Sequence, residues 1–75
     1  MYFPRLKDLR KDRDLTQKQI GEYLWISQRT YSSYETGKRN IPFDVFIALA
    51  MFYKVSLDYL AGLTDEKKPY ERKKK

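Results

Sequence analysis

The polar side chains of residues 15–35 have the clearest capacity to recognise another molecule. Gln28, Arg29 and Ser33 fall at the start and on the outer side of a helix that we expect over residues 28–36. An arginine can donate two parallel hydrogen bonds to guanine, and a glutamine can pair in the same way with adenine. These residues could therefore read the edges of bases, and a solvated polar face is the alternative interpretation.

Composition excludes several kinds of chemistry. The 75 residues include no Cys and no His, which excludes disulfides, thiol catalysis and His- or Cys-ligated metal sites. Ser, Asp and Lys are present, but no nucleophile is placed beside an activating base. We therefore expect no enzymatic activity, no cofactor and no metal.

The charge suggests a polyanionic partner. The net charge is +6 and the pI is about 9.6. Half of the excess falls in residues 65–75, so the folded part is less basic than the total suggests. No apolar run reaches the ~18 residues that a membrane span requires, and the N-terminus lacks a signal-peptide core. We expect a cytoplasmic protein without membrane contact.

The elements that would position the polar residues are five short helices. Pro4 suits the first turn of a helix, and Thr16 followed by Gln19 forms a capping-box pattern. Gly21 lies inside a helix, where glycine is unfavourable unless another helix crosses closely. The expected helices cover residues 3–12, 17–24, 28–36, 43–53 and 57–61, and a basic, disordered tail is expected over residues 64–75.

The stretch LRKDRDLTQKQIGEYLWISQRTYSSYETGKRNIP, with VSLDYL further on, resembles the Cro/phage-repressor type of helix-turn-helix, the XRE family. The resemblance covers about residues 5–63. It implies an all-α, lambda-repressor-like DNA-binding domain over residues 1–63, with helices two and three as the helix-turn-helix. It also implies that the third helix enters the major groove of double-stranded DNA.

The resemblance assigns a role to each group of residues. Gln28, Arg29 and Ser33 would contact bases, and Arg10 would form a structural ion pair with Glu35. Phosphate contacts are expected from Gln17, Ser27, Thr30, Lys38, Arg39 and Asn40. Members of the family commonly dimerise through the last helix and the loop before it, and helix four is also strongly apolar. The candidates for a dimer interface are Phe52, Val55, Leu57, Tyr59 and Leu63.

Five positions depart from the family pattern, of which Gly21 in place of alanine is a mild change. Trp25 stands where the family places a turn glycine, and a positive φ there would cost about 1 kcal/mol for a residue with a side chain. Tyr31 replaces an aliphatic core residue. Tyr53 and Lys54 replace a Leu-Gly pair.

The expected function is sequence-specific DNA binding by a homodimeric transcriptional regulator, a repressor that occupies a palindromic operator. An antitoxin or another regulator that pairs with a protein partner is the alternative, and it shares this fold. Non-specific DNA or RNA binding through the basic tail is a third class. Since the sequence ends shortly after the expected domain, we expect no second domain.

Overall fold

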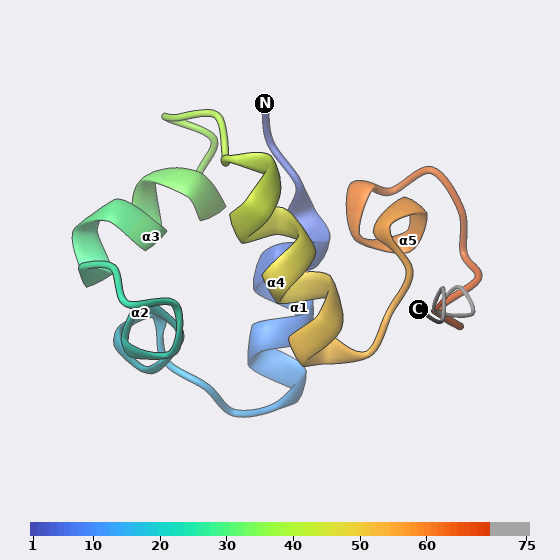
Figure 1. Ribbon diagram of the computed structural model, residues 1–75, viewed down its shortest axis with the longest axis horizontal. Coiled ribbons are helices and arrows are strands. Elements are labelled where there is room, and N and C mark those ends of the chain that lie inside the picture. Colours follow the sequence, from blue (N-terminus) through green and yellow to red (C-terminus); the bar gives the residue numbers. More distant parts are fainter. Residues whose placement is uncertain (70–75) are drawn as a thin grey trace, which may run out of the picture.

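The computed structural model describes residues 1–69, and this part of the chain forms five helices and no strand. The helices are α1 (Pro4–Asp12), α2 (Gln17–Leu24), α3 (Gln28–Glu35), α4 (Phe43–Tyr53) and α5 (Leu57–Ala61). Figure 1 shows α1 and α4 in the middle, α2 and α3 on one side, and α5 on the other. The all-α class with five short helices is confirmed, and the expected bounds agree to within one residue.

Hydroxyl side chains cap the starts of α2, α3 and α5. The Gln19 N–H donates to the Thr16 hydroxyl oxygen at 3.1 Å, and the Thr16 N–H donates to the Gln19 side chain at 2.8 Å. This reciprocal pair is the expected capping box, and it satisfies two N–H groups at the start of α2. Ser27 and Ser56 cap α3 and α5 by accepting the N–H three residues further on.

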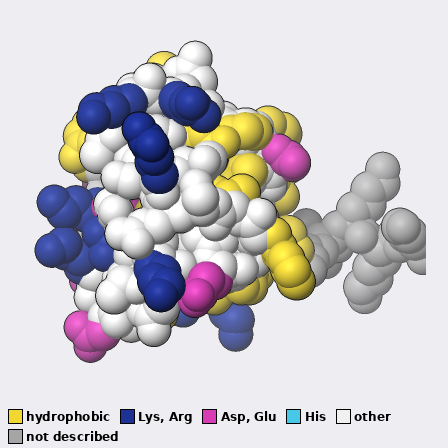
Figure 2. Space-filling view, turned by 90° about the vertical axis from the view of Figure 1, so that its left-hand side faces the viewer, with side chains coloured by type: hydrophobic (Ala, Val, Ile, Leu, Met, Phe, Trp, Pro, Cys, Tyr) yellow, Lys and Arg dark blue, Asp and Glu magenta, His cyan; other side chains and the backbone are white. Residues whose placement is uncertain are grey.

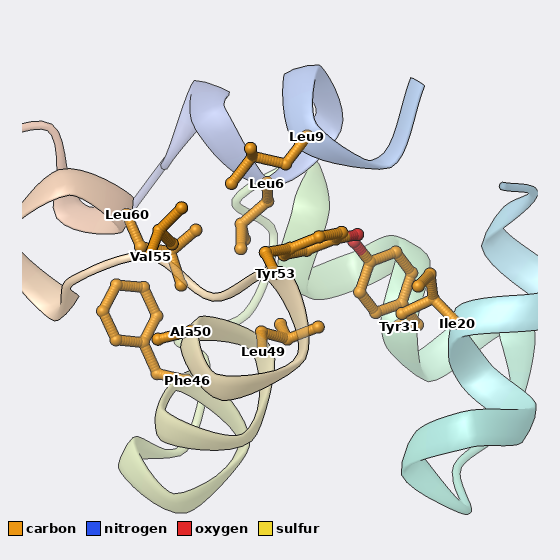
Figure 3. Packing of buried hydrophobic residues seen from close by; sticks show 10 residues of the cluster. All are labelled: Leu6, Leu9, Ile20, Tyr31, Phe46, Leu49, Ala50, Tyr53, Val55 and Leu60. Carbon is orange, nitrogen blue, oxygen red and sulfur yellow. The ribbon is translucent and has the colours of Figure 1, made fainter. Parts of the chain in front are cut away.

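The core gathers around α4 and draws on every helix. Figure 3 shows side chains from α1, α2 and α3 converging on α4. Phe3 adds to the edge of this core, with its ring centroid 5.0 Å from that of Phe46. The buried apolar residues are Leu6, Leu9, Ile20, Tyr31, Phe46, Leu49, Ala50, Tyr53, Val55 and Leu60.

Residues 64–67 lie against the helical domain, and we call them the strap. Arg5 donates hydrogen bonds to the carbonyl of Thr64 and, at 2.7 Å, to the Asp65 carboxylate. The Ser56 N–H donates to the carbonyl of Lys67 at 3.0 Å. These contacts differ from the disorder expected for this segment, because a charged sequence can still be held through its backbone. Residues 70–75 of the expected tail lie outside the described residues, and the domain boundary stays a prediction.

Candidate nucleic-acid interface

The turn between α2 and α3 adopts the left-handed conformation that the sequence raised as a possibility. Trp25 has φ 61° and ψ 36°, and its N–H donates to the carbonyl of Glu22. Positive φ is uncommon for a bulky residue, and it costs about 1 kcal/mol relative to glycine. Lys54 ends α4 in the same conformation, at φ 57°. Both departures from family glycines therefore retain the backbone that glycine would adopt.

Gly21 allows the two helices to approach closely. A Cβ at this position would lie 3.0 Å from the Ile26 carbonyl oxygen and 3.4 Å from the backbone nitrogen of Gln28. Both neighbours are backbone atoms and cannot move aside cheaply. The close approach expected at Gly21 is confirmed, but the expectation of a crossing helix is wrong, because the neighbour is the backbone of the turn and of the first residue of α3.

An open groove runs along the outer side of α3. Its lining residues are Gln17, Ser27, Gln28, Arg29, Thr30, Ser32, Ser33, Thr36, Lys38 and Arg39. The lining is polar, with three cations and no acid. The left-hand side of Figure 1, seen face-on in Figure 2, carries several Lys and Arg side chains, and a few acidic side chains lie lower on the same face. All of the expected base- and phosphate-contacting residues except Asn40 are brought together here.

The hydroxyl groups of α3 differ in what they can offer a partner. Ser27 accepts the Thr30 N–H at 3.0 Å and donates its own proton to the Thr30 hydroxyl oxygen at 2.9 Å. Ser33 donates to the backbone carbonyl of Thr30 at 2.6 Å. The hydroxyl proton of Thr30 is thus left for an outside acceptor, whereas the oxygen of Ser33 is left to accept.

The basic loop after α3 is tied to the helix. The N–H of Arg39 donates to the carbonyl of Ser33 at 3.1 Å. Lys38 and Arg39 are exposed and lie at the edge of the groove. Asn40 makes a contact outside the groove, in which its side-chain oxygen accepts from the Met1 amino group at 2.8 Å. Asn40 therefore lies apart from the groove, at an apolar pocket beside Phe43.

The inner side of α3 is fixed by a buried ion pair. Arg10 Nε and Nη2 donate to the two carboxylate oxygens of Glu35, each at 2.9 Å, and Nη1 donates to the carbonyl of Leu15 at 2.8 Å. Glu35 is only 3% exposed. The structural pair expected from the sequence is therefore formed, as a bidentate contact between α1 and α3.

Ionisation of this pair favours the folded chain. Burial raises the pKa of Glu35, but hydrogen bonds led by that of Arg10 outweigh burial and leave the pKa below its ordinary value. The hydrogen bond to Glu35 raises the pKa of Arg10. Gln17 joins the network, since its side-chain N–H lies 3.4 Å from Glu35 Oε1. Gln17 thus connects the buried pair to the groove that it also lines.

Two tyrosines lie beside the ion pair. Figure 3 shows Tyr31 of α3 and Tyr53 of α4 pointing toward one another. Neither hydroxyl finds a hydrogen-bond partner among the described residues. Burial raises the pKa of Tyr53 to about 12, and burial also raises the pKa of Tyr31. The aromatic residues that depart from the family pattern therefore place two polar atoms inside the core.

The structure also locates residues that the sequence did not single out or placed differently. Ser32 and Thr36 line the groove, and their spacing of four residues on a helix is the signal that could have found them. Val55, a dimer candidate, is buried in the core and only 6% exposed, which leaves little surface for a partner. Within residues 1–69, no cluster of His, Cys, Asp or Glu could hold a metal ion, and no helix is long and apolar enough to cross a membrane.

The sequence profile of the helix-turn-helix family matches residues 6–60. The uncharacterized HTH-type transcriptional regulator YobD of Bacillus subtilis (strain 168) is 40% identical over 74 residues, which cover 99% of this chain and 66% of YobD. No solved structure gives a significant match.

Two further relatives extend the comparison. The HTH-type transcriptional regulator ImmR of Bacillus subtilis (strain 168) is 37% identical over 89% of this chain and 53% of its own length. The cryptic phage CTXphi transcriptional repressor RstR of Vibrio cholerae is 31% identical over 83% of this chain and 56% of its own length. The chain thus spans between about half and two thirds of the length of these relatives.

Proposed function

Because the chain belongs to the Cro/phage-repressor type of the helix-turn-helix family of DNA-binding regulators, we propose that it recognises specific sequences in double-stranded DNA. The observation that supports this most strongly is the groove along α3. It combines exposed amide and guanidinium groups with cations at its edge and no acid. This pattern suits the major groove and its flanking phosphates.

Gln28 and Arg29 are the proposed base readers. Both are exposed at the first turn of α3, where a recognition helix contacts base edges. Ser33 would read differently, because its proton is already donated to the carbonyl of Thr30. In this rotamer its oxygen accepts, so Ser33 suits the amino group of adenine or cytosine.

The phosphate contacts are proposed for residues that flank these readers. The free hydroxyl proton of Thr30 can reach a phosphate oxygen, while Ser27 orients Thr30. Lys38 and Arg39 supply charge at the other end of α3. Gln17, which is hydrogen-bonded to Glu35, would contact the DNA backbone from the start of α2. Asn40 lies outside the groove and its side-chain oxygen accepts from Met1, so it could offer a phosphate only its amide N–H groups.

Dimerisation and repression form the second layer of the proposal. A twofold dimer would place two α3 helices about 34 Å apart, to match one turn of a palindromic operator. Leu63 is 79% exposed and Phe52 and Leu57 are half-buried, so they remain interface candidates, together with Tyr59. The Vibrio cholerae relative RstR is a transcriptional repressor, which supports repression as the role, and occupation of an operator would be its means.

In vitro selection of bound DNA from a random pool tests the proposal. We expect enrichment of a palindrome whose half-sites are about one helical turn apart. An enriched sequence without twofold symmetry would contradict the dimer. A pool that shows no enrichment, from a protein that is folded, would contradict sequence-specific binding.

A further inference from the structure

The side chain of Trp25 has no role in the fold. It is 93% exposed, although tryptophan is usually well buried. Its backbone also carries the strain of a left-handed turn, which glycine would avoid. A strained, bulky residue that packs on nothing is a reason to look for a function outside the chain.

The turn places Trp25 beside the groove along α3. It lies two residues before Ser27, so their Cα atoms are at most about 8 Å apart. Ser27 and Gln28 line the groove, whereas Trp25 does not. The backbone of Trp25 therefore lies close to the end of the groove at which α3 begins, and its side chain is exposed there. A partner that fills the groove and continues past this end would meet the indole.

The chemistry of indole matches the backbone of DNA. The ring nitrogen is a hydrogen-bond donor without charge, and phosphate oxygens are acceptors. The ring faces are apolar and can cover the C–H surface of deoxyribose. Trp25 could thus hold the backbone without reading a base and without adding a cation.

A protein partner is the competing occupant, and the surroundings of Trp25 favour DNA. Nearby apolar surface exists, because Tyr23 is half exposed and its ring centroid lies 4.5 Å from that of Phe52. The indole does not pack on this pair, as its exposure shows. On the other side the chain continues through Ile26 to Ser27 and Gln28, which line the groove. An isolated indole bordering a basic groove suits a polyanion better than an apolar protein surface.

We propose that Trp25 contacts the sugar-phosphate backbone of DNA, beside the base pairs that the start of α3 reaches. It would act as an uncharged anchor that lengthens the stretch of DNA in contact with the protein. This inference rests on the proposed DNA binding. Tryptophan occurs once in the sequence, so its fluorescence reports this residue alone.

Quenching of this fluorescence by acrylamide tests the contact in the full chain. The probe is a random-sequence duplex of about three helical turns, ~30 base pairs, at low salt, with complex formation followed separately by the mobility of labelled duplex. We expect the quenching constant to fall at least twofold in the complex. A complex with unchanged quenching would overturn the inference and leave the proposed function intact.

Two other outcomes are distinct. Protection of the indole from acrylamide that appears without DNA and grows with protein concentration would indicate a protein contact. That result would overturn the inference. A folded protein that forms no complex with any duplex would overturn the proposed function, and the inference with it.

Substitution provides a second test. Trp25→Gly should keep or raise the melting temperature, because glycine tolerates the turn. It should weaken binding to the duplex about two- to tenfold, the value of one hydrogen bond. The slope of affinity against salt should stay at its wild-type value, since no charge is removed. Met51→Ala, at another exposed apolar side chain, is the matched control and should bind as wild type. A Trp25→Gly variant with wild-type affinity would contradict the contact.

Discussion

The two sides of α3 are built in opposite ways. On the inner side, Glu35 is buried and both of its oxygens accept from Arg10. On the outer side, Gln28 and Arg29 are exposed, and within residues 1–69 neither side chain forms a hydrogen bond or an ion pair. The inner side thus satisfies its charges within the chain, while the outer side keeps its hydrogen-bonding capacity for a partner.

The inner side of α3 thus positions the helix, and the outer side is available to recognise a partner. A buried pair contributes little net stability, but losing one partner leaves an uncompensated charge in the core. Exposed side chains contribute little to folding and can therefore be chosen for what they contact. Substitutions on the inner side should change stability first, and substitutions on the outer side should change only DNA binding.

The largest effect is expected from Glu35→Gln. It leaves Arg10 charged and buried beside a neutral amide, which should cost about 3 kcal/mol of unfolding free energy in urea denaturation. DNA binding should fall as well, because α3 loses the contact with α1 that holds it in place. Asp65→Asn is the control, since Asp65 pairs with Arg5 at a fully exposed carboxylate and its loss should change stability little. A Glu35→Gln variant with wild-type stability and affinity would contradict the positioning role.

The next effect concerns alkaline pH. Because the pKa of Tyr53 is about 12 in the folded chain and 10.0 ordinarily, the unfolded chain releases this proton first. Stability from this group is complete below pH 10 and is lost as the pH rises toward 12, by about 2 kcal/mol. Tyr53→Phe should remove part of this loss, and Tyr31 would account for the remainder.

Urea denaturation of both proteins at pH 7 and across pH 10 to 12 checks this. At pH 7 the variant should be as stable as wild type or more so, because the hydroxyl has no partner in the described part of the chain. Identical alkaline profiles for the two proteins would show that Tyr53 does not titrate as its burial requires.

A smaller effect is expected from Lys38→Ala on the outer side. Lys38 lies at the edge of the groove, and its removal should leave the melting temperature unchanged. Binding should weaken about equally on all sequences, and the salt slope should fall by about 1. Electrophoretic mobility shifts across a salt series measure both. Loss of binding on the selected sequence alone would contradict a phosphate contact.

The sequence predicted the features of α2 and α3 well where they depend on residues that are close together in the chain. Thr16 with Gln19, and Ser27, cap their helices through neighbours three residues away. Gly21 was expected at a close approach, and the turn backbone lies there. The Arg10–Glu35 pair came from family resemblance rather than from spacing, since its members are 25 residues apart.

The rest depended on contacts between distant residues. Asn40 looks like part of a basic loop, but the Met1 amino group, 39 residues away, takes its side chain. Arg5 holds the strap 60 residues further along the chain. No local pattern encodes such pairs, because they exist only after the helices have packed. The same holds for the bond that turns Ser33 into an acceptor, which requires a particular rotamer.

The central claim is that the outer side of α3 reads base pairs. The most direct measurement compares wild type and Arg29→Ala on the selected duplex and on duplexes with one base pair changed at each position. We predict that Arg29→Ala loses about 1–3 kcal/mol of binding free energy on the selected duplex and becomes indifferent to the base at one position. Equal losses on selected and random duplexes, with discrimination retained at every position, would contradict the claim.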